Sequence, residues 1–80
     1  MMTGTAQKVM EYFEAQAMVK SGMVISFSEL SCHAKSWGPQ HADNLRSAME
    51  ELRYEGYMII TPTNSLELTD RGYFYLFNEV

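Results

Sequence analysis

The middle of the chain carries two helix signals separated by only a short polar turn. The first signal is Ser26-Phe27-Ser28-Glu29, a capping box in which the serine hydroxyl meets a first-turn amide and the glutamate reaches back to the cap. A helix is expected over about 27–34, ended by the polar stretch 35–38. Pro39 suits the first position of the next helix, which needs no amide hydrogen. The sequence therefore predicts two helices joined by a tight polar turn.

Helical spacing of apolar residues defines a helix before this pair and the extent of its second member. A first helix is expected over about 3–20, capped by Thr3 or Thr5 and stopped near Gly22. The helix that begins at Pro39 is expected to continue over about 39–55. The apolar positions are Ala6, Val9, Met10, Phe13 and Ala17 in the first helix, and Ala42, Leu45, Ala48, Met49 and Leu52 in the second.

Strand-forming residues occupy two further regions. The run 23–25 is too short for more than an edge or third strand, whereas 57–60 and 66–68 flank a turn over 61–65 and predict a hairpin over about 57–68. A last helix is expected over about 70–78, although its aromatic content leaves a strand as the alternative. The fold class is therefore predicted to be α+β, with a three-helix core, a β-hairpin and a C-terminal helix.

The chain length and composition predict a single domain. Eighty residues are too few for two separate cores, and 46% hydrophobic with 20% charged residues is ordinary for a globular chain. A lone cysteine, Cys32, favours a reducing, cytoplasmic setting. No stretch approaches the roughly 20 apolar residues of a membrane span, and charges are scattered through 1–21, where a signal peptide would be apolar.

Three motifs in this order resemble the winged helix-turn-helix family, as seen in MarR-like and PadR-like regulators. They are ISFSEL at 25–30, similar to the opening of the family's second helix, LRYEGYM at 52–58, similar to the exit of the recognition helix into the wing, and LELTDRG at 66–72, similar to the return strand and its following cap. The resemblance covers nearly the whole chain. The turn 37–39 and a wing tip without basic residues depart from the family pattern.

The resemblance implies sequence-specific binding to double-stranded DNA, by a small transcriptional or replication regulator that reads bases with the start of the helix at 39–55. Gln40 and Asn44 suit adenine and Arg46 suits guanine, while Lys35, Ser36 and His41 suit phosphates. The full expected set of DNA-binding residues is Lys35, Ser36, Trp37, Gln40, His41, Asn44, Arg46 and Ser47.

Several residues have a second interpretation. Trp37 either stacks against DNA or pins two helices together as a partly buried ring, and Cys32 is either a redox switch or, as we favour, a small buried thiol. His33 and His41 lack the spacing of a metal site. No phosphate-binding glycine loop or nucleophile motif is present, so no catalytic residues, cofactor or enzymatic activity are expected.

The net charge of −4 opposes the DNA-binding hypothesis and supports an alternative. That alternative is an acidic winged-helix module that binds a protein, such as a phage or plasmid accessory protein that recognises a host factor. A single small domain would hold DNA weakly, so a homodimer is expected. The first helix and the aromatic segment 73–77 have apolar residues to spare for the interface.

Overall fold

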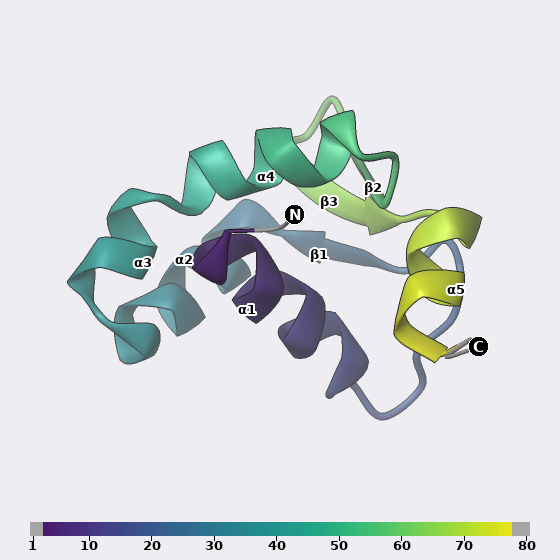
Figure 1. Cartoon of the computed structure of the whole chain (residues 1–80), viewed down its shortest axis with the longest axis horizontal. Coiled ribbons are helices and arrows are strands. Elements are labelled where there is room, and N and C mark those ends of the chain that lie inside the picture. Colours follow the sequence, from purple (N-terminus) through teal and green to yellow (C-terminus); the bar gives the residue numbers. More distant parts are fainter. Residues whose placement is uncertain (1–2, 78–80) are drawn as a thin grey trace.

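The computed structural model describes residues 3–77, and over that range the chain is a small α+β protein with five helices and a three-stranded antiparallel sheet (Figure 1). The elements in chain order are α1 (Gly4–Glu14), β1 (Val24–Ser26), α2 (Phe27–Trp37), α3 (Pro39–Asp43), α4 (Leu45–Tyr54), β2 (Met58–Ile60), β3 (Ser65–Leu68) and α5 (Asp70–Phe77).

The sheet is built from the predicted hairpin and the short early strand. Its order is β1-β3-β2, so β3 lies in the middle and pairs antiparallel with both neighbours. The turn between β2 and β3 closes with Asn64 at φ 62°, a left-handed conformation that asparagine tolerates better than most residues. The hairpin is therefore confirmed, and the short strand expected at 23–25 is an edge strand that lies one residue later, at 24–26.

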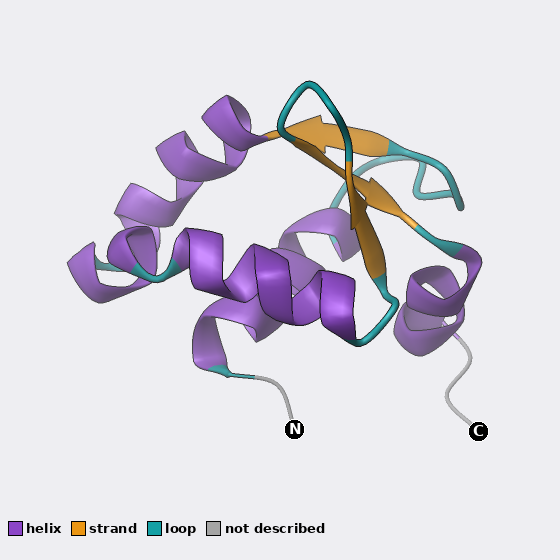
Figure 2. Cartoon of the chain, turned by 90° about the horizontal axis from the view of Figure 1, so that it is seen from above, coloured by secondary structure: helices purple, strands orange, loops and turns teal. Residues whose placement is uncertain are grey.

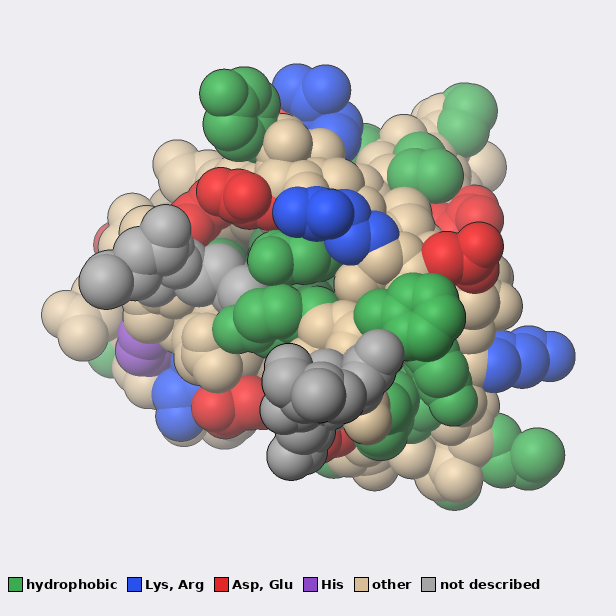
Figure 3. All heavy atoms as spheres, turned by 45° about the vertical axis from the view of Figure 1, so that its right-hand side comes forward, with side chains coloured by type: hydrophobic (Ala, Val, Ile, Leu, Met, Phe, Trp, Pro, Cys, Tyr) green, Lys and Arg blue, Asp and Glu red, His purple; other side chains and the backbone are tan. Residues whose placement is uncertain are grey.

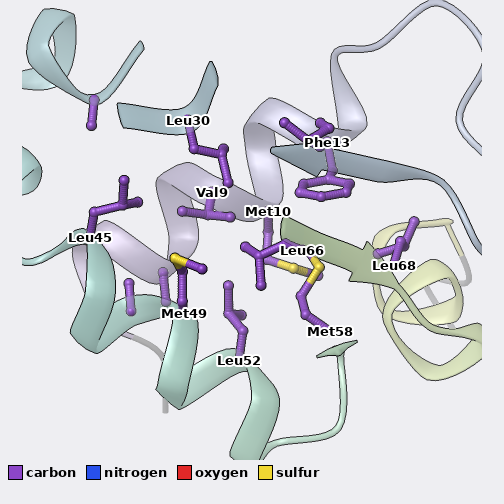
Figure 4. Close-up of a cluster of buried hydrophobic side chains, with 14 residues drawn as sticks. Val9, Met10, Phe13, Leu30, Leu45, Met49, Leu52, Met58, Leu66 and Leu68 are labelled. Atoms are coloured by element: carbon purple, nitrogen blue, oxygen red, sulfur yellow. The ribbon is translucent and has the colours of Figure 1, made fainter. Parts of the chain in front are cut away.

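The helices α1, α2 and α4 gather on one side of the sheet, whereas α3 and α5 lie at opposite ends of the molecule (Figures 1 and 2). The apolar stripes of α1 and α4 face each other and the sheet, which buries a single core (Figure 4). Its largest fully buried side chains are Phe13, Met10, Leu30, Leu45, Met49, Leu52, Met58, Leu66, Leu68 and Val9.

Helix α1 is shorter than the expected 3–20 because its contact with the core ends early. Phe13 is the last side chain of its stripe to be fully buried, and Ala17, expected on the same stripe, is exposed. Further turns would bury no more apolar surface, and most helix stability comes from such burial. The Gln16 side chain instead donates to the Tyr12 carbonyl at 2.8 Å and so satisfies one of the end carbonyls.

Helix α2 starts as expected and runs three residues past the expected end. Ser26 accepts a hydrogen bond from the Glu29 amide at 3.1 Å, but the expected return contact of Glu29 is wrong, since its carboxylate accepts from the Tyr12 hydroxyl instead. At the other end, Ser36 donates to the His33 carbonyl at 2.7 Å. Gly38, at φ 122°, then turns the chain where a side chain would be strained.

The single helix expected over 39–55 is two helices that meet at Asn44. Pro39 does open α3, but Asn44 adopts φ −95° and ψ 5°, and α4 begins at the next residue. Asparagine is a poor helix former because its short polar side chain competes for backbone hydrogen bonds. Helix α3 packs mainly on α2, whereas α4 packs on α1 and β2, so the two segments have different supports.

The last segment is a helix and not the alternative strand. Thr69 caps it by accepting from the Gly72 amide at 3.0 Å, while its hydroxyl donates to the Gly56 carbonyl. The expected final residue of this helix, Asn78, lies outside the described residues. Only Gly72 of α5 is fully buried, while Tyr73 and Leu76 are partly buried against the core.

Candidate nucleic-acid interface

The outer face of α4 carries two of the residues that the sequence assigned to DNA, Arg46 and Ser47. Leu45, Ala48, Met49 and Leu52 are buried, and the exposed residues are therefore confined to the other side of the helix. In order along α4, the exposed residues are Arg46, Ser47, Glu50, Arg53 and Tyr54. The face thus begins with a cation and a hydroxyl next to the Asn44 bend.

Arg46 connects three elements at the start of α4. Its guanidinium carbon lies 4.7 Å from the centroid of the Phe27 ring in α2, and its Nη1 donates to Asn64 Oδ1 in the hairpin turn at 3.4 Å. The ring is half-buried, and its contact limits the conformations of a long side chain that would otherwise lose entropy on binding. Arg46 therefore presents its charge at the junction of the helix and the hairpin turn.

The second cation on this face is paired with an acid. Arg53 donates to Glu50 Oε1 from Nη2 at 2.7 Å and from Nε at 2.9 Å, in an exposed pair one helical turn apart. Such a pair adds little stability in water, but it neutralises the charge of Arg53. The C-terminal half of the face consequently offers less to a phosphate than the N-terminal half.

Of the α3 residues, Gln40 is exposed but His41 is committed to the protein. The Nδ1 atom of His41 lies 2.9 Å from the Thr5 hydroxyl, and Thr5 is almost fully buried in α1. This contact ties α3 to the start of α1 and leaves His41 half-buried. Asn44, at the bend, is exposed and lies beside the α4 face.

Residues at the end of α2 have separate roles. Lys35 is exposed, Ser36 uses its hydroxyl to close the helix, and Trp37 is half-buried with its ring edge toward Tyr12, at 6.5 Å between centroids. Trp37 thus joins α2 to α1, as the packing interpretation predicted. Within the set of eight, the structure brings together Asn44, Arg46 and Ser47, and gives His41 and Trp37 contacts inside the protein.

Two of the remaining cations, Lys20 and Arg71, lie away from this face. Arg71 belongs to α5, and Lys20 precedes Ser21, whose hydroxyl donates to the α5 residue Asp70. Helix α5 lies at the other end of the molecule's longest axis, of 33 Å, from α3 (Figure 1). A large positive patch around Gln40 and Asn44 is therefore not formed by these residues.

A second polar cluster lies between α1 and α2. The Tyr12 hydroxyl donates to Glu29 Oε2 at 2.5 Å, and its ring lies 4.4 Å from the ring of His33. Partial burial of the phenol and the adjacent carboxylate raise the pKa of Tyr12 to about 12. Tyr12 therefore keeps its proton at neutral pH and holds the two helices together.

The expected buried state of Cys32 is wrong, because the thiol is exposed. Leu30 and Ala34 define the buried side of α2. Cys32 is two residues from each of them, so its side chain points to the opposite side of the helix. Within residues 3–77, no group of three or more histidine, cysteine, aspartate or glutamate side chains is placed to hold a metal. Nor does any helix in the described part have the length and apolar character needed to cross a membrane.

Sequence reasoning missed the partners that give Arg46 its position. Asn64 was expected only as part of the turn 61–65, and neither Asn64 nor Phe27 was connected with the residues expected to bind DNA. No local sequence pattern predicts this contact, because Phe27, Arg46 and Asn64 are far apart in the chain. The Thr5 contact of His41 was missed for the same reason.

Comparison with protein-family models, with curated proteins and with solved structures finds no match to this chain.

Proposed function

We propose that this chain is a winged helix-turn-helix domain that binds double-stranded DNA, with α4 as the recognition helix and the β2–β3 turn as the wing. The proposed role is recognition of DNA and not catalysis. Such binding would serve to regulate transcription or replication. The observation that carries the proposal is the junction at Arg46, where the start of the exposed α4 face, helix α2 and the hairpin turn meet.

The order of elements supports the winged assignment. A helix, a short strand, a helical pair and a hairpin follow one another, and the early strand pairs with the second hairpin strand. This is the order that the sequence motifs suggested by resemblance, with α3 as an added turn inside the connection between α2 and α4. The exposed half of α4 is then the side that a major groove would accept.

The base-reading set under this proposal is Asn44, Arg46 and Ser47. Asparagine can pair with adenine and arginine with guanine, and a serine hydroxyl can serve either base. Gln40 and Lys35, both exposed, flank the set and suit phosphate contacts. Trp37 and Ser36 stabilise the end of α2, and their proposed contribution to DNA binding is indirect.

The salt dependence of binding tests the electrostatic side of the proposal. Only Arg46 and Lys35 among the proposed contacts carry a full positive charge. Each neutralised phosphate contributes a slope of roughly −0.9 in the logarithm of the binding constant against the logarithm of salt concentration. The expected slope is therefore about −2 per chain, shallow for a DNA-binding protein.

The direct experiment is fluorescence anisotropy with a library of duplex fragments, followed by Arg46→Ala on the best fragment. We expect the substitution to weaken binding by about 1–3 kcal/mol, roughly 5- to 150-fold, and to relax base preference at one position. Lys20→Ala is the matched control, since it removes one exposed charge from the α5 end and should leave affinity unchanged. Equal losses in both variants, or no binding to any fragment at low salt, would refute the proposal.

The second candidate function is a winged-helix module that binds a protein partner. The net charge of −4 and the scattered cations favour it, because a phosphate backbone rewards a positive face. Under this alternative, the anisotropy of duplex DNA does not change at any salt concentration. Arg46→Ala then changes the affinity for the protein partner and has no effect with DNA.

A further inference from the structure

Glu50 lies in the middle of the exposed face of α4, although the sequence did not place it among the residues expected to bind DNA. Successive residues of an α-helix are about 100° apart around its axis. Glu50 is therefore about 40° from Arg46 on one side and about 60° from Ser47 on the other. A duplex that lies against this face meets the Glu50 carboxylate between the two.

The α4 face differs in character from the α5 end of the molecule. At that end, hydrophobic side chains gather and charged side chains lie at their margin (Figure 3). Each exposed side chain of α4, by contrast, carries a polar or charged group. This face therefore suits a ligand that is recognised by hydrogen bonds, as the edges of bases are.

Arg53 holds one oxygen of the Glu50 carboxylate and leaves the other available. Both of its hydrogen bonds, at 2.7 Å from Nη2 and 2.9 Å from Nε, go to Oε1. Oε2 accepts no hydrogen bond from the part of the chain that the structure describes, and the side chain is 52% exposed. The guanidinium fork limits the orientations of the carboxylate, so less side-chain entropy is lost when Oε2 binds a donor.

An ionised carboxylate accepts hydrogen bonds and donates none, so it discriminates among bases in the major groove. Guanine presents the acceptors N7 and O6, and thymine presents the acceptor O4, so both repel a carboxylate. Adenine has an amino group but places the acceptor N7 beside it, whereas cytosine presents its N4 amino group alone. An oriented glutamate at the centre of the face therefore favours cytosine.

We infer that Glu50 reads a cytosine and that Arg53 positions it, an inference that rests on the proposed DNA-binding function. Arg46, which suits guanine, lies four residues earlier on the same face, about 6 Å away along the helix axis. Neighbouring base pairs are about 3.4 Å apart, so the cytosine lies about one or two base pairs from that guanine. The ligand is therefore duplex DNA that carries a guanine and a cytosine at this spacing.

The same carboxylate weakens binding to other sequences. Opposite guanine or thymine it adds repulsion that no donor offsets, and such repulsion contributes to specificity as much as attraction does. A face with few cations is thus selective even though its total affinity is low.

Fluorescence anisotropy with the best duplex of the library and its single base-pair variants tests the inference. At one position the parent should prefer cytosine over each other base at least about tenfold. Glu50→Ala should reduce this preference to less than about twofold. Glu50→Gln should shift it to adenine, because an amide offers a donor and an acceptor. The preference for guanine at the Arg46 position should remain in both variants.

Glu11→Gln is the matched control, because Glu11 is an exposed acid of α1 outside the α4 face. It removes the same charge and should leave the base preference unchanged. Arg53→Ala should lower the cytosine preference about threefold in the parent and have no further effect in Glu50→Ala. That dependence on Glu50 separates positioning from a general loss of stability, and thermal melts verify that each variant folds.

The outcomes distinguish failure of the inference from failure of the proposed function. If binding depends on Arg46 but Glu50→Gln keeps the base preference of the parent, the inference is overturned and the proposed function stands. A shift of preference that Glu11→Gln also produces would overturn the inference alone. Absence of binding to every duplex would overturn both.

Discussion

Gly72 lets α5 rest directly on the backbone that enters β2. A Cβ atom at this position would lie 2.2 Å from the Tyr57 carbonyl oxygen and 2.8 Å from Leu68 Cδ1. Carbon atoms do not approach such an oxygen closer than about 3.0 Å, so Gly72→Ala must displace α5 or β2 by about 0.8 Å. The oxygen cannot simply move aside, because it accepts from the Thr69 amide at 3.1 Å.

The magnitude follows from three opposing effects. Overpacking costs about 1–3 kcal/mol, and weakened hydrogen bonds from Thr69 cost about 1 kcal/mol each. Replacing glycine inside a helix returns up to about 1 kcal/mol. We therefore expect Gly72→Ala to lower the free energy of unfolding by about 2–4 kcal/mol.

Urea unfolding followed by circular dichroism measures this loss, and trypsin cleavage after Arg71 reports whether α5 has separated from the body. Gly4→Ala is the matched control, because a Cβ at that helical glycine meets only His41 Cε1 at an ordinary 3.7 Å. It should be neutral or stabilising by up to about 1 kcal/mol. If Gly72→Ala is as stable as the parent and equally resistant to trypsin, the close packing of α5 on Tyr57 is refuted.

Two further predictions concern contacts that join the helices. His41→Ala leaves the nearly buried Thr5 hydroxyl without its partner, so the free energy of unfolding measured with a denaturant should fall by about 1–3 kcal/mol. The double variant with Thr5→Val should recover part of this loss. Equal stability of the parent and His41→Ala would contradict the contact. The raised pKa of Tyr12, about 12 against an ordinary value of 10, means that its contribution to stability is complete below pH 10 and is lost as the pH rises toward 12. Tyr12→Phe should flatten the decline in unfolding free energy over that window, and an unchanged profile would show that Tyr12 does not titrate there.

Local signals in the sequence predicted several boundaries correctly. The Ser26 cap, Pro39 at a helix start and the turn before β3 each act through neighbouring atoms, so they can be recognised without knowing the fold. The exposure of Cys32 was also within reach of the sequence. The spacing of Leu30 and Ala34 fixes which side of α2 faces inward.

Other features depend on residues distant in the chain. Helix α1 ends at Glu14 because the core ends there, and this limit is set by the size of the body and not by the residues 15–20. The Glu29 carboxylate turns to Tyr12 because α1 lies beside α2. Asparagine has a low helix propensity, which by itself does not end a helix. The helix ends at Asn44 because α3 packs on α2 whereas α4 packs on α1 and β2.

The bend at Asn44 determines which residues are available for recognition. An unbroken helix would have placed Gln40 and His41 on the same helix as Arg46. Instead, α3 packs on α2 and, through His41, contacts α1. The proposed reading face is therefore short and carries few charges. Under the proposed function, such a face makes few contacts with a duplex, so the expected salt dependence of binding is shallow.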